Sequence, residues 1–468
     1  MTIKLANLIK ASALTGPRYR VIADTIADAV SSGALTKGER LPPMRDLAFA
    51  LSVTTGTIAR AYALGVTRQH LASEVGRGTY VRSAETDGTP SLARPAPVDE
   101  ADSEITMKAN LPAALGQADR LTHETALMLA KGDPKRFDYL PTGGTRAQRE
   151  AGANWLSTGA FAPAADNVLL CSGAQQAILT AILATTEPGD LILTEALTYH
   201  AITAQALMLG RRVAPVEMDD DGLVPEALAK ACRGSRVTAL FTVPTLHNPT
   251  TITMSAKRRT AIAEIAASQQ ISVIEDDIYA NLMDERPSPL AHLIPKQTYY
   301  LNSLSKAVAP GLRVAYLVPP REQQERVRAI LHGLGQTLPP LMAELATRII
   351  ANGTAAKLVA HQKTEIAARN DLATRWLRDT PRRQAKAAMH LWLQLPEHWR
   401  AGAFVEAARH RGVLIAGGEE FMVGRPDQAA RHVRLCLGAA ANRTKLEQGL
   451  KIVSELMNET PFETHSLA

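Results

Sequence analysis

The fold of the larger part of this chain is decided by the stretch SLSKAVAPGLR, residues 303–313, which directly continues the apolar run TYYLNS, residues 298–303. A lysine placed just after a buried strand, between hydroxyl groups, suits a cofactor that forms a Schiff base and carries a phosphate. Lys306 would form the imine, and Ser303, Ser305 and Arg313 would bind the phosphate. The alternative interpretation is a surface lysine on a serine-rich turn.

A second group of polar residues ends the apolar run SVIEDD, residues 272–277. Asp276 can keep a pyridine nitrogen protonated, which makes the ring an electron sink, and Tyr279 can reach the ring hydroxyl. Asn248, in the sequence HNPT (247–250), offers a second donor to that hydroxyl. Acids after a strand are alternatively a solvated cap, and an Asn-Pro pair is alternatively only a turn.

A third segment, LCSGAQQ (170–176), passes from a predicted strand through Gly173 into a predicted helix. The first backbone N–H groups of such a helix, here those of Ala174 and Gln175, are free to bind a phosphate. By itself a strand–glycine–helix junction is weak evidence for a phosphate site.

Around these segments, short apolar runs alternate with alanine-rich amphipathic stretches from about residue 105 onward. Helices are predicted at 174–186 and 256–268. Strands separated by helices predict a largely parallel α/β sheet with its functional groups at the strand ends. The predicted strands are 168–170, 191–194, 239–244, 272–277, 298–303 and 314–319.

Composition and charge separate a small basic part from a neutral body. The chain has 468 residues, enough for two or three domains, with 46% hydrophobic and 21% charged residues. These values exclude a disordered or collagen-like chain. Residues 1–84 hold 11 Lys and Arg against 5 Asp and Glu, whereas the other 384 residues hold 41 of each kind. A basic module on a neutral body indicates a head that binds a polyanion.

Three cysteines, Cys171, Cys232 and Cys436, are odd in number and widely spaced. They build no disulfide framework and no CxxC metal pattern, so no metal site is predicted. No apolar run approaches 18 residues, and the first 16 residues lack the apolar core of a signal peptide. We therefore expect a cytoplasmic protein.

The head, residues 1–83, is predicted to be a small α+β winged helix-turn-helix. Pro17 opens a first helix, Leu41-Pro42-Pro43 precedes a second, and Thr54 is a natural N-cap for a third. Residues 74–81, EVGRGTYV, carry two glycines between strand-like flanks and predict a hairpin. The third helix of this fold enters the DNA major groove. Residues 84–104 hold three prolines and few large apolar residues, which is typical of a linker.

In their order and separation, the segments of residues 105–468 resemble the fold type I pyridoxal 5′-phosphate (PLP) enzymes, the aspartate aminotransferase superfamily. The resemblance implies a large α/β aminotransferase-like body that binds PLP. It also implies that Tyr139, in YLPTGG (139–144), reaches the phosphate of the partner subunit, and that Tyr199 stacks on the cofactor ring. Arg434, in VRL (433–435), would pair bidentately with the carboxylate of a substrate or effector. Thr251 departs from the family, which normally has glycine there.

The head resembles the GntR-type winged helix through GERLPPMRDLA (38–48), IARAY (58–62) and GRGTYV (76–81). The resemblance implies that the DNA contacts are mainly to phosphates. The expected contact residues are Arg45, Thr55, Thr57, Arg60 and Arg77. The family usually has Ser-Arg where this chain has Thr54-Thr55, and Gly56 weakens the helix by up to about 1 kcal/mol. The alternative is a degenerate head that only helps folding.

A GntR-type head on an aminotransferase-like body resembles the MocR subfamily of GntR regulators. This resemblance implies a bacterial, nucleoid-associated homodimer that binds double-stranded operator DNA. It would sense an amino acid or related amine through aldimine formation with PLP bound at Lys306. The competing hypothesis is a working PLP-dependent aminotransferase with a fused head, in which Lys306 is the general base. A third interpretation, in which free PLP is itself the effector, stays open.

Overall fold

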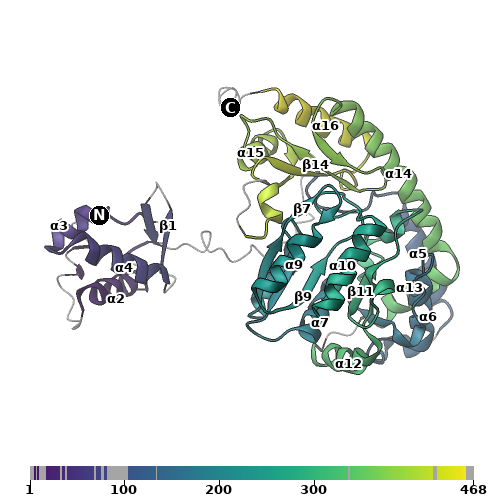
Figure 1. Cartoon of the computed structure of the whole chain (residues 1–468). Coiled ribbons are helices and arrows are strands. Elements are labelled where there is room, and N and C mark those ends of the chain that lie inside the picture. Colours follow the sequence, from purple (N-terminus) through teal and green to yellow (C-terminus); the bar gives the residue numbers. More distant parts are fainter. Residues whose placement is uncertain are drawn as a thin grey trace. The chain divides into compact units, whose positions relative to one another are not determined.

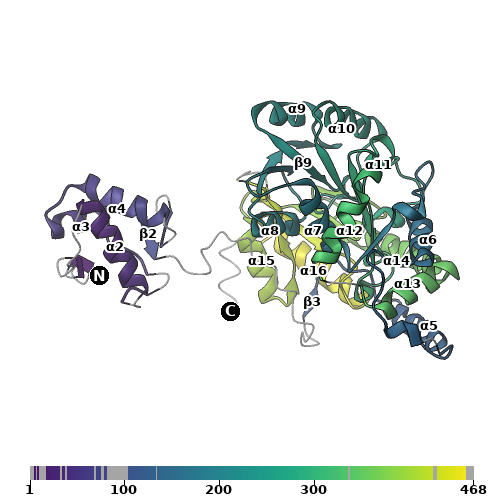
Figure 2. The ribbon, with the colours of Figure 1, turned by 90° about the horizontal axis from the view of Figure 1, so that it is seen from below.

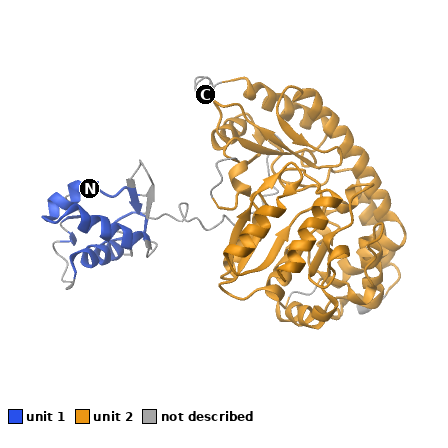
Figure 3. Ribbon diagram, in the orientation of Figure 1, with its two compact units in different colours: residues 1–93 blue, residues 94–468 orange. Residues whose placement is uncertain are grey.

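The computed structural model describes residues 5–6, 8–9, 17–31, 34–36, 39–67, 70–74, 78–81, 104–132, 134–335, 338–424 and 429–459. The chain divides into two compact units, residues 1–93 and 94–468 (Figure 3). The division falls inside the predicted linker 84–104, of which only residue 104 is among the described residues. Among the described residues no single helix is both long and apolar enough to cross a membrane, although the helices Met44–Leu51 and Thr55–Val66, bent by 116°, pass that test as a pair.

The N-terminal unit is a helix-turn-helix followed by a hairpin, as predicted (Figure 1). Its helices are α2 (Arg18–Ser31), α3 (Met44–Leu51) and α4 (Thr55–Thr67), and its strands are β1 (Leu71–Glu74) and β2 (Gly78–Val81), which pair antiparallel. The chain reverses after α3 at Ser52, whose φ is 53°. The wing residue Arg77 lies outside the described residues. Leu5, Ala6 and Ile9 are buried in the core of this unit, although no sequence pattern predicted their contribution.

The second unit is built on a seven-stranded sheet in the order β4-β12-β11-β10-β9-β5-β6. Every strand predicted for the sheet is present, and β12 alone runs antiparallel to the others. The strand β6, which contains Pro215 and lies at the sheet edge, was not predicted. The strands are β4 (Leu169–Cys171), β5 (Leu191–Glu195), β6 (Arg212–Val216), β9 (Val237–Thr242), β10 (Ser272–Asp276), β11 (Thr298–Ser303) and β12 (Ala315–Val318).

Helices cover both faces of this sheet because its strands are apolar on both sides. Leu191 and Leu193 face one core and Ile192 the other, as the period of two requires. The helices α9 (Pro225–Gly234) and α10 (Ala256–Ser268) lie on the opposite side of the sheet from α7 (Ala174–Thr185) and α8 (His200–Met208) (Figure 2). The seven-stranded sheet and the helices packed around it form the large lobe of this unit. The other helices of the large lobe are α5 (Gln117–Leu129), α6 (Arg146–Leu156), α11 (Leu290–Leu293), α12 (Gln324–Gly333) and α13 (Pro340–Ala351).

A second lobe packs around the four-stranded sheet β13-β14-β17-β16. Its core includes Ile105 and Met107, so the first described residues of this unit belong to the second lobe. The short strand β3 (Ile105–Thr106) pairs with β15 (Val413–Leu414). The other elements of this lobe are β13 (Arg382–Gln384), β14 (His390–Gln394), β16 (Ala416–Gly417), β17 (His432–Cys436), α14 (Thr354–Trp376), α15 (Ala401–His410) and α16 (Arg443–Met457).

Candidate cofactor and effector site

The predicted site residues follow the carboxyl ends of neighbouring strands. Asp276 is the last residue of β10, Ser303 is the last residue of β11, and Lys306 lies in the turn after β11. Asn248 lies in the loop after β9, and Tyr199 lies directly before α8. Because β5, β9, β10 and β11 run parallel, these ends meet at one edge of the sheet.

Lys306 is partly buried, and its amine donates a hydrogen bond to the backbone carbonyl of Asn110 at 2.5 Å. Desolvation lowers the pKa of Lys306 to about 8, and the positive charges of Arg434 and Arg313 act in the same direction. The negative charge of Asp276 opposes them. An amine with this pKa is partly neutral near neutral pH, as a nucleophile must be.

Asp276 is buried, and its carboxylate receives a long hydrogen bond of 3.4 Å from the amide of Ile278. Burial, with a smaller contribution from the adjacent Asp277, raises the pKa of Asp276 to about 7, although Lys306 acts to lower it. A buried carboxylate that receives only one long hydrogen bond is poorly compensated for the loss of its hydration, which destabilises its charged form. It therefore favours a cationic donor such as the protonated nitrogen of a pyridine ring.

The N-terminus of α7 and the guanidinium of Arg313 lie side by side and together form a cradle for an anion. Gly173 has a φ of +85°, and a Cβ atom there would lie 2.5 Å from Nη2 of Arg313. No side chain caps α7, so its first amides remain available to an anion. Ser303 is buried, and its hydroxyl accepts a hydrogen bond from the amide of Ser305 at 3.3 Å. Ser303 pairs with Ala315, and Ala315 pairs with Cys171, so Ser303 lies at the same edge of the sheet as the start of α7.

Tyr199 lies beside this cradle. Its hydroxyl accepts a hydrogen bond of 3.0 Å from the side-chain amide of Gln175, the second residue of α7. Burial raises the pKa of Tyr199. The ring is therefore fixed next to the predicted phosphate site, as an aromatic that stacks on a cofactor requires.

Arg434 approaches from the second lobe, on β17. Its guanidinium donates to Oδ1 of Asn248 at 2.7 Å and to the backbone carbonyl of Lys108 at 2.7 Å. Its Cζ lies 4.6 Å from the centroid of the Phe421 ring, and its Nε has no hydrogen-bond partner among the described residues. A buried guanidinium with a free donor is suited to a carboxylate. Asn248, predicted as a donor to the cofactor, accepts from this arginine through its side-chain oxygen.

Two residues in the site have no counterpart among those predicted from the sequence. Asn110 donates from Nδ2 to the hydroxyl of Tyr279 at 2.9 Å, and the same amide lies 3.2 Å from Nδ1 of His390. His390 Nε2 donates to the carbonyl of His247 at 3.1 Å, and burial lowers the pKa of His390 to about 3. A histidine within the apolar run MHLWL (389–393) was the available signal, whereas no motif marks Asn110.

Thr251 shows why glycine is usual at this position. Its φ is +64°, in the left-handed region, and its amide donates to the carbonyl of His247 at 2.6 Å. The loop that holds Asn248 thus keeps a conformation that favours glycine, although the residue is β-branched.

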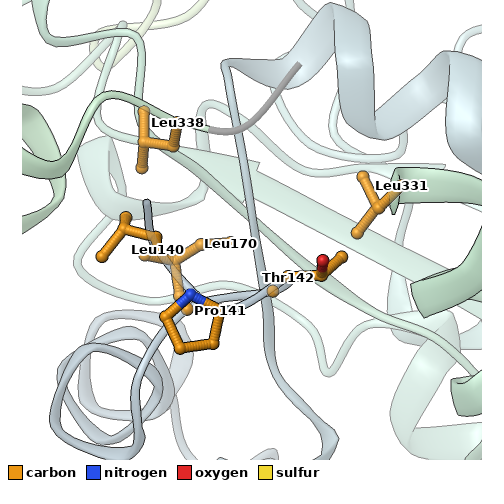
Figure 4. A pocket seen from close by; sticks show the side chains of 8 residues that line it. Leu140, Pro141, Thr142, Leu170, Leu331 and Leu338 are labelled. Atoms are coloured by element: carbon orange, nitrogen blue, oxygen red, sulfur yellow. The ribbon is translucent and has the colours of Figure 1, made fainter. Parts of the chain in front are cut away.

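Tyr139 is not part of the site within one chain. Its side chain is 95% exposed, and nearby Phe137 is 75% exposed. The following segment, residues 140–144, covers a cavity of about 20 Å³ that Leu170, Leu331 and Leu338 also line (Figure 4). This cavity holds about one water molecule and is far too small for a cofactor.

In the head, Arg45, Thr55 and Arg60 are exposed. The hydroxyl of Thr54 accepts from the amide of Thr57 at 3.3 Å, so the predicted N-cap of α4 is confirmed. The hydroxyl of Thr57 is itself bonded to Thr54 at 2.9 Å. Arg60 lies with its Cζ 6.0 Å from the ring of Tyr19 on α2.

Two family models match the chain. Aminotransferase class I and II matches residues 106–453, and the gntR family of bacterial regulatory proteins matches residues 18–81. The HTH-type transcriptional regulator YdeF of Bacillus subtilis is 31% identical over 95% of this chain and 95% of its own. The vitamin B6 salvage pathway transcriptional repressor PtsJ of Salmonella typhimurium is 27% identical over 89% of this chain and 94% of its own.

Among solved structures, an archaeal alanine:glyoxylate aminotransferase matches with a TM-score of 0.71 and 22% identity. The match covers 75% of this chain and 90% of that enzyme. At this identity the similarity confirms the predicted α/β fold of the body.

Proposed function

This chain belongs to the class I and II aminotransferase family and, with its gntR-type head, to the MocR-like HTH-type transcriptional regulators; on that premise we propose that it regulates transcription according to the amino compound bound in its body. The family's cofactor is PLP, and the donor set fits it. A buried acid, a cradle at Gly173 and Arg313, and a lysine with a lowered pKa are the groups that such a cofactor needs.

One observation carries the proposal. Lys306 and Arg434 bind the carbonyls of Asn110 and Lys108, which are two residues apart in the chain. An amine-binding group and a carboxylate-binding group that converge in this way match an α-amino acid, which bears both functions on one carbon atom. The effector class that this geometry favours is therefore an amino acid or a close relative.

Each residue has a defined task in this proposal. PLP supplies an aldehyde that reacts with amines and a ring that withdraws electrons. Lys306 would hold the cofactor covalently, Asp276 would keep the proton on the ring nitrogen, and Arg434 would orient the effector carboxylate. Asn248 and Tyr279 would donate toward the ring oxygen, and Tyr199 would stack on the ring. The phosphate would be bound by Ala174, Gln175, Ser303, Ser305 and Arg313.

Regulation further requires that the effector bind two arrangements of body and heads with different affinity. The test is to follow the absorbance of bound PLP and a DNA footprint in one sample while amino acids are added. We expect an amino acid that changes the spectrum to change the footprint as well. Lys306→Ala should abolish covalent trapping of PLP by borohydride, whereas Lys451→Ala, on the exposed face of α16, should not. A footprint indifferent to every amine that changes the spectrum would refute the proposal.

A working aminotransferase is the second candidate. The pKa of Lys306, about 8, favours it, because a neutral amine near neutral pH can act as a general base. Complete transfer of an amino group to a keto acid at many turnovers per chain would support the enzyme. A reaction that stops after the spectrum changes would support the sensor.

PLP itself is a third candidate effector, favoured by the similarity to PtsJ, which is named a repressor of vitamin B6 salvage. The DNA footprint of the cofactor-free protein tests this candidate, because the addition of PLP alone should then change the footprint.

We further propose a cytoplasmic, nucleoid-associated homodimer with a DNA-binding domain at 1–83, a linker at 84–104 and the PLP-binding body at 105–468. Its partner would be double-stranded operator DNA.

A further inference from the structure

Asn110 lies at the point where the two lobes of the body meet in the site. Asn110 follows β3, and backbone hydrogen bonds of β3 and of Met107 anchor this segment to the second lobe. The amides of Ile105 and Met107 donate to the carbonyls of Gly412 and Leu414, both at 2.7 Å. On the other side, Ala113 is hydrogen-bonded through its amide and its carbonyl to the side chain of Gln362, at 3.1 and 2.6 Å. Asn110 is therefore held between two fixed anchors.

The polar atoms of Asn110 contact both lobes. Its carbonyl accepts from Lys306, and its Nδ2 donates to the hydroxyl of Tyr279, both in the large lobe. The same Nδ2 group lies 3.2 Å from Nδ1 of His390, on β14 of the second lobe. Because Nε2 of neutral His390 donates to a carbonyl, its Nδ1 is an acceptor, so the amide NH₂ must face it. Both amide protons are thus assigned.

This assignment fixes the role of the Tyr279 hydroxyl. Its oxygen already accepts a hydrogen bond from Nδ2 of Asn110, so the O–H of Tyr279 remains free to donate to another group. The charged and titratable groups acting on Tyr279 are Arg434, Asp276, Cys436 and Tyr199, and burial raises its pKa strongly, so the hydroxyl stays protonated. A donor is what the ring oxygen of PLP requires.

We propose that Asn110 is a positioning residue of the cofactor site: by donating to Tyr279 and accepting from Lys306, it makes the tyrosine a donor and sets the place of the amine. The proposal rests on the proposed function, since it concerns PLP bound at Lys306. Oδ1 of Asn110 is buried with no hydrogen-bond partner among the described residues, so the side chain is held by its two donated bonds alone.

The test is the pH at which the visible absorbance of bound PLP changes. The negative charge on the ring oxygen of PLP attracts the proton near Nζ of Lys306 and so raises the pH at which that proton is lost. A hydrogen-bond donor to the ring oxygen reduces this charge, and therefore lowers the midpoint of the pH titration. Asn110→Ala should weaken that donor and raise the midpoint by about half to one pH unit, the size expected for one hydrogen bond. Asn110→Asp should raise it further, because the carboxylate would accept the hydrogen bond that the Tyr279 hydroxyl otherwise donates to the ring oxygen. The other groups that act on Lys306, namely Asp276, Arg313, Arg434 and Cys436, are unchanged in both variants.

A double-mutant cycle separates this role from a merely structural one. In the Tyr279→Phe background, Asn110→Ala should leave the midpoint where Tyr279→Phe alone put it. The control is Asn167→Ala, which removes a hydrogen bond to Pro319 outside the site and should shift nothing. If Asn110→Ala does not fold, Asn110→Ser tests the same shift with a smaller cavity.

A midpoint equal to that of the wild type in all Asn110 variants would overturn the proposal, as would fully additive shifts in the cycle. Failure of the proposed function is a different result. In that case the wild-type protein itself would bind no PLP that borohydride can trap.

Discussion

Lys306 owes its chemistry to its surroundings. Desolvation lowers its pKa to about 8 from an ordinary value of 10.5. Because the neutral amine is the nucleophile, the rate of PLP capture by the cofactor-free protein should rise with pH up to about 8 and then level off. Stopped-flow absorbance at a series of pH values measures this rate. A rate that still climbed steeply between about pH 9 and 10 would contradict the lowered pKa.

The buried carboxylate of Asp276 destabilises the cofactor-free protein, and we expect bound PLP to remove this destabilisation. Asp276→Asn should weaken PLP binding by roughly ten- to hundredfold, the value of a hydrogen bond to a charged group. The cofactor-free variant should melt at the same temperature as the wild type or higher, since an uncompensated buried carboxylate is removed. Calorimetry with and without PLP measures both. Equal stabilisation by PLP in both proteins would exclude Asp276 from this role.

At the scale of elements, the junction between β4 and α7 depends on Gly173. Its φ of +85° and its closeness to Arg313 leave no room for a side chain. Gly173→Ala should weaken PLP binding by roughly five- to hundredfold through backbone strain and displacement of Arg313. Gly311→Ala is the matched control, because no atom lies within 4 Å of the added methyl group. Titration with PLP and with pyridoxal, which lacks the phosphate, should show that only PLP binding suffers.

The helix α4 is the element expected to contact DNA. Arg60→Ala should lower DNA affinity and reduce the slope of log affinity against log salt by about 0.9 for each phosphate that the protein no longer neutralises. The exposed Arg120 of the body provides the control, and Arg120→Ala should keep both values. Fluorescence anisotropy between about 50 and 200 mM salt measures the slope. An unchanged slope would place Arg60 away from the phosphates.

For the whole molecule, the exposure of Tyr139 favours a dimer with shared sites, since this side chain contributes nothing to the site of its own chain. Light scattering should give a mass about twice that of the 50.3 kDa chain. Mixing Lys306→Ala with Tyr139→Ala chains should restore high-affinity PLP binding in mixed dimers, because one of their two sites then holds both residues. A monomer with PLP fully bound would exclude this arrangement.

Much of the site could be predicted because its residues follow strands whose apolar runs are visible in the sequence. Asp276 ends one such run and Lys306 follows another, and parallel strands carry their ends to one edge. Arg313 precedes β12, which runs antiparallel to β11 and therefore begins at the same edge. Asn110 and His390 could not be found in this way. Asn110 contacts Tyr279, 169 positions away in the chain, and its own segment has no motif. The strand β6 and the buried residues Leu5, Ala6 and Ile9 were missed because their patterns are short and irregular.

The sequence by itself determined the winged helix-turn-helix head, the α/β body and the lysine that marks the cofactor site. These depend on local signals: the hydrophobic period, glycine and proline punctuation, and the polar residues at strand ends. Only the tertiary structure decided the protonation and the partners of these groups. Burial sets the pKa values of Lys306 and Asp276, and the meeting of two lobes places Asn110 between Lys306, Tyr279 and His390. Desolvation and hydrogen bonding act through distances in space, which the order of residues along the chain does not contain.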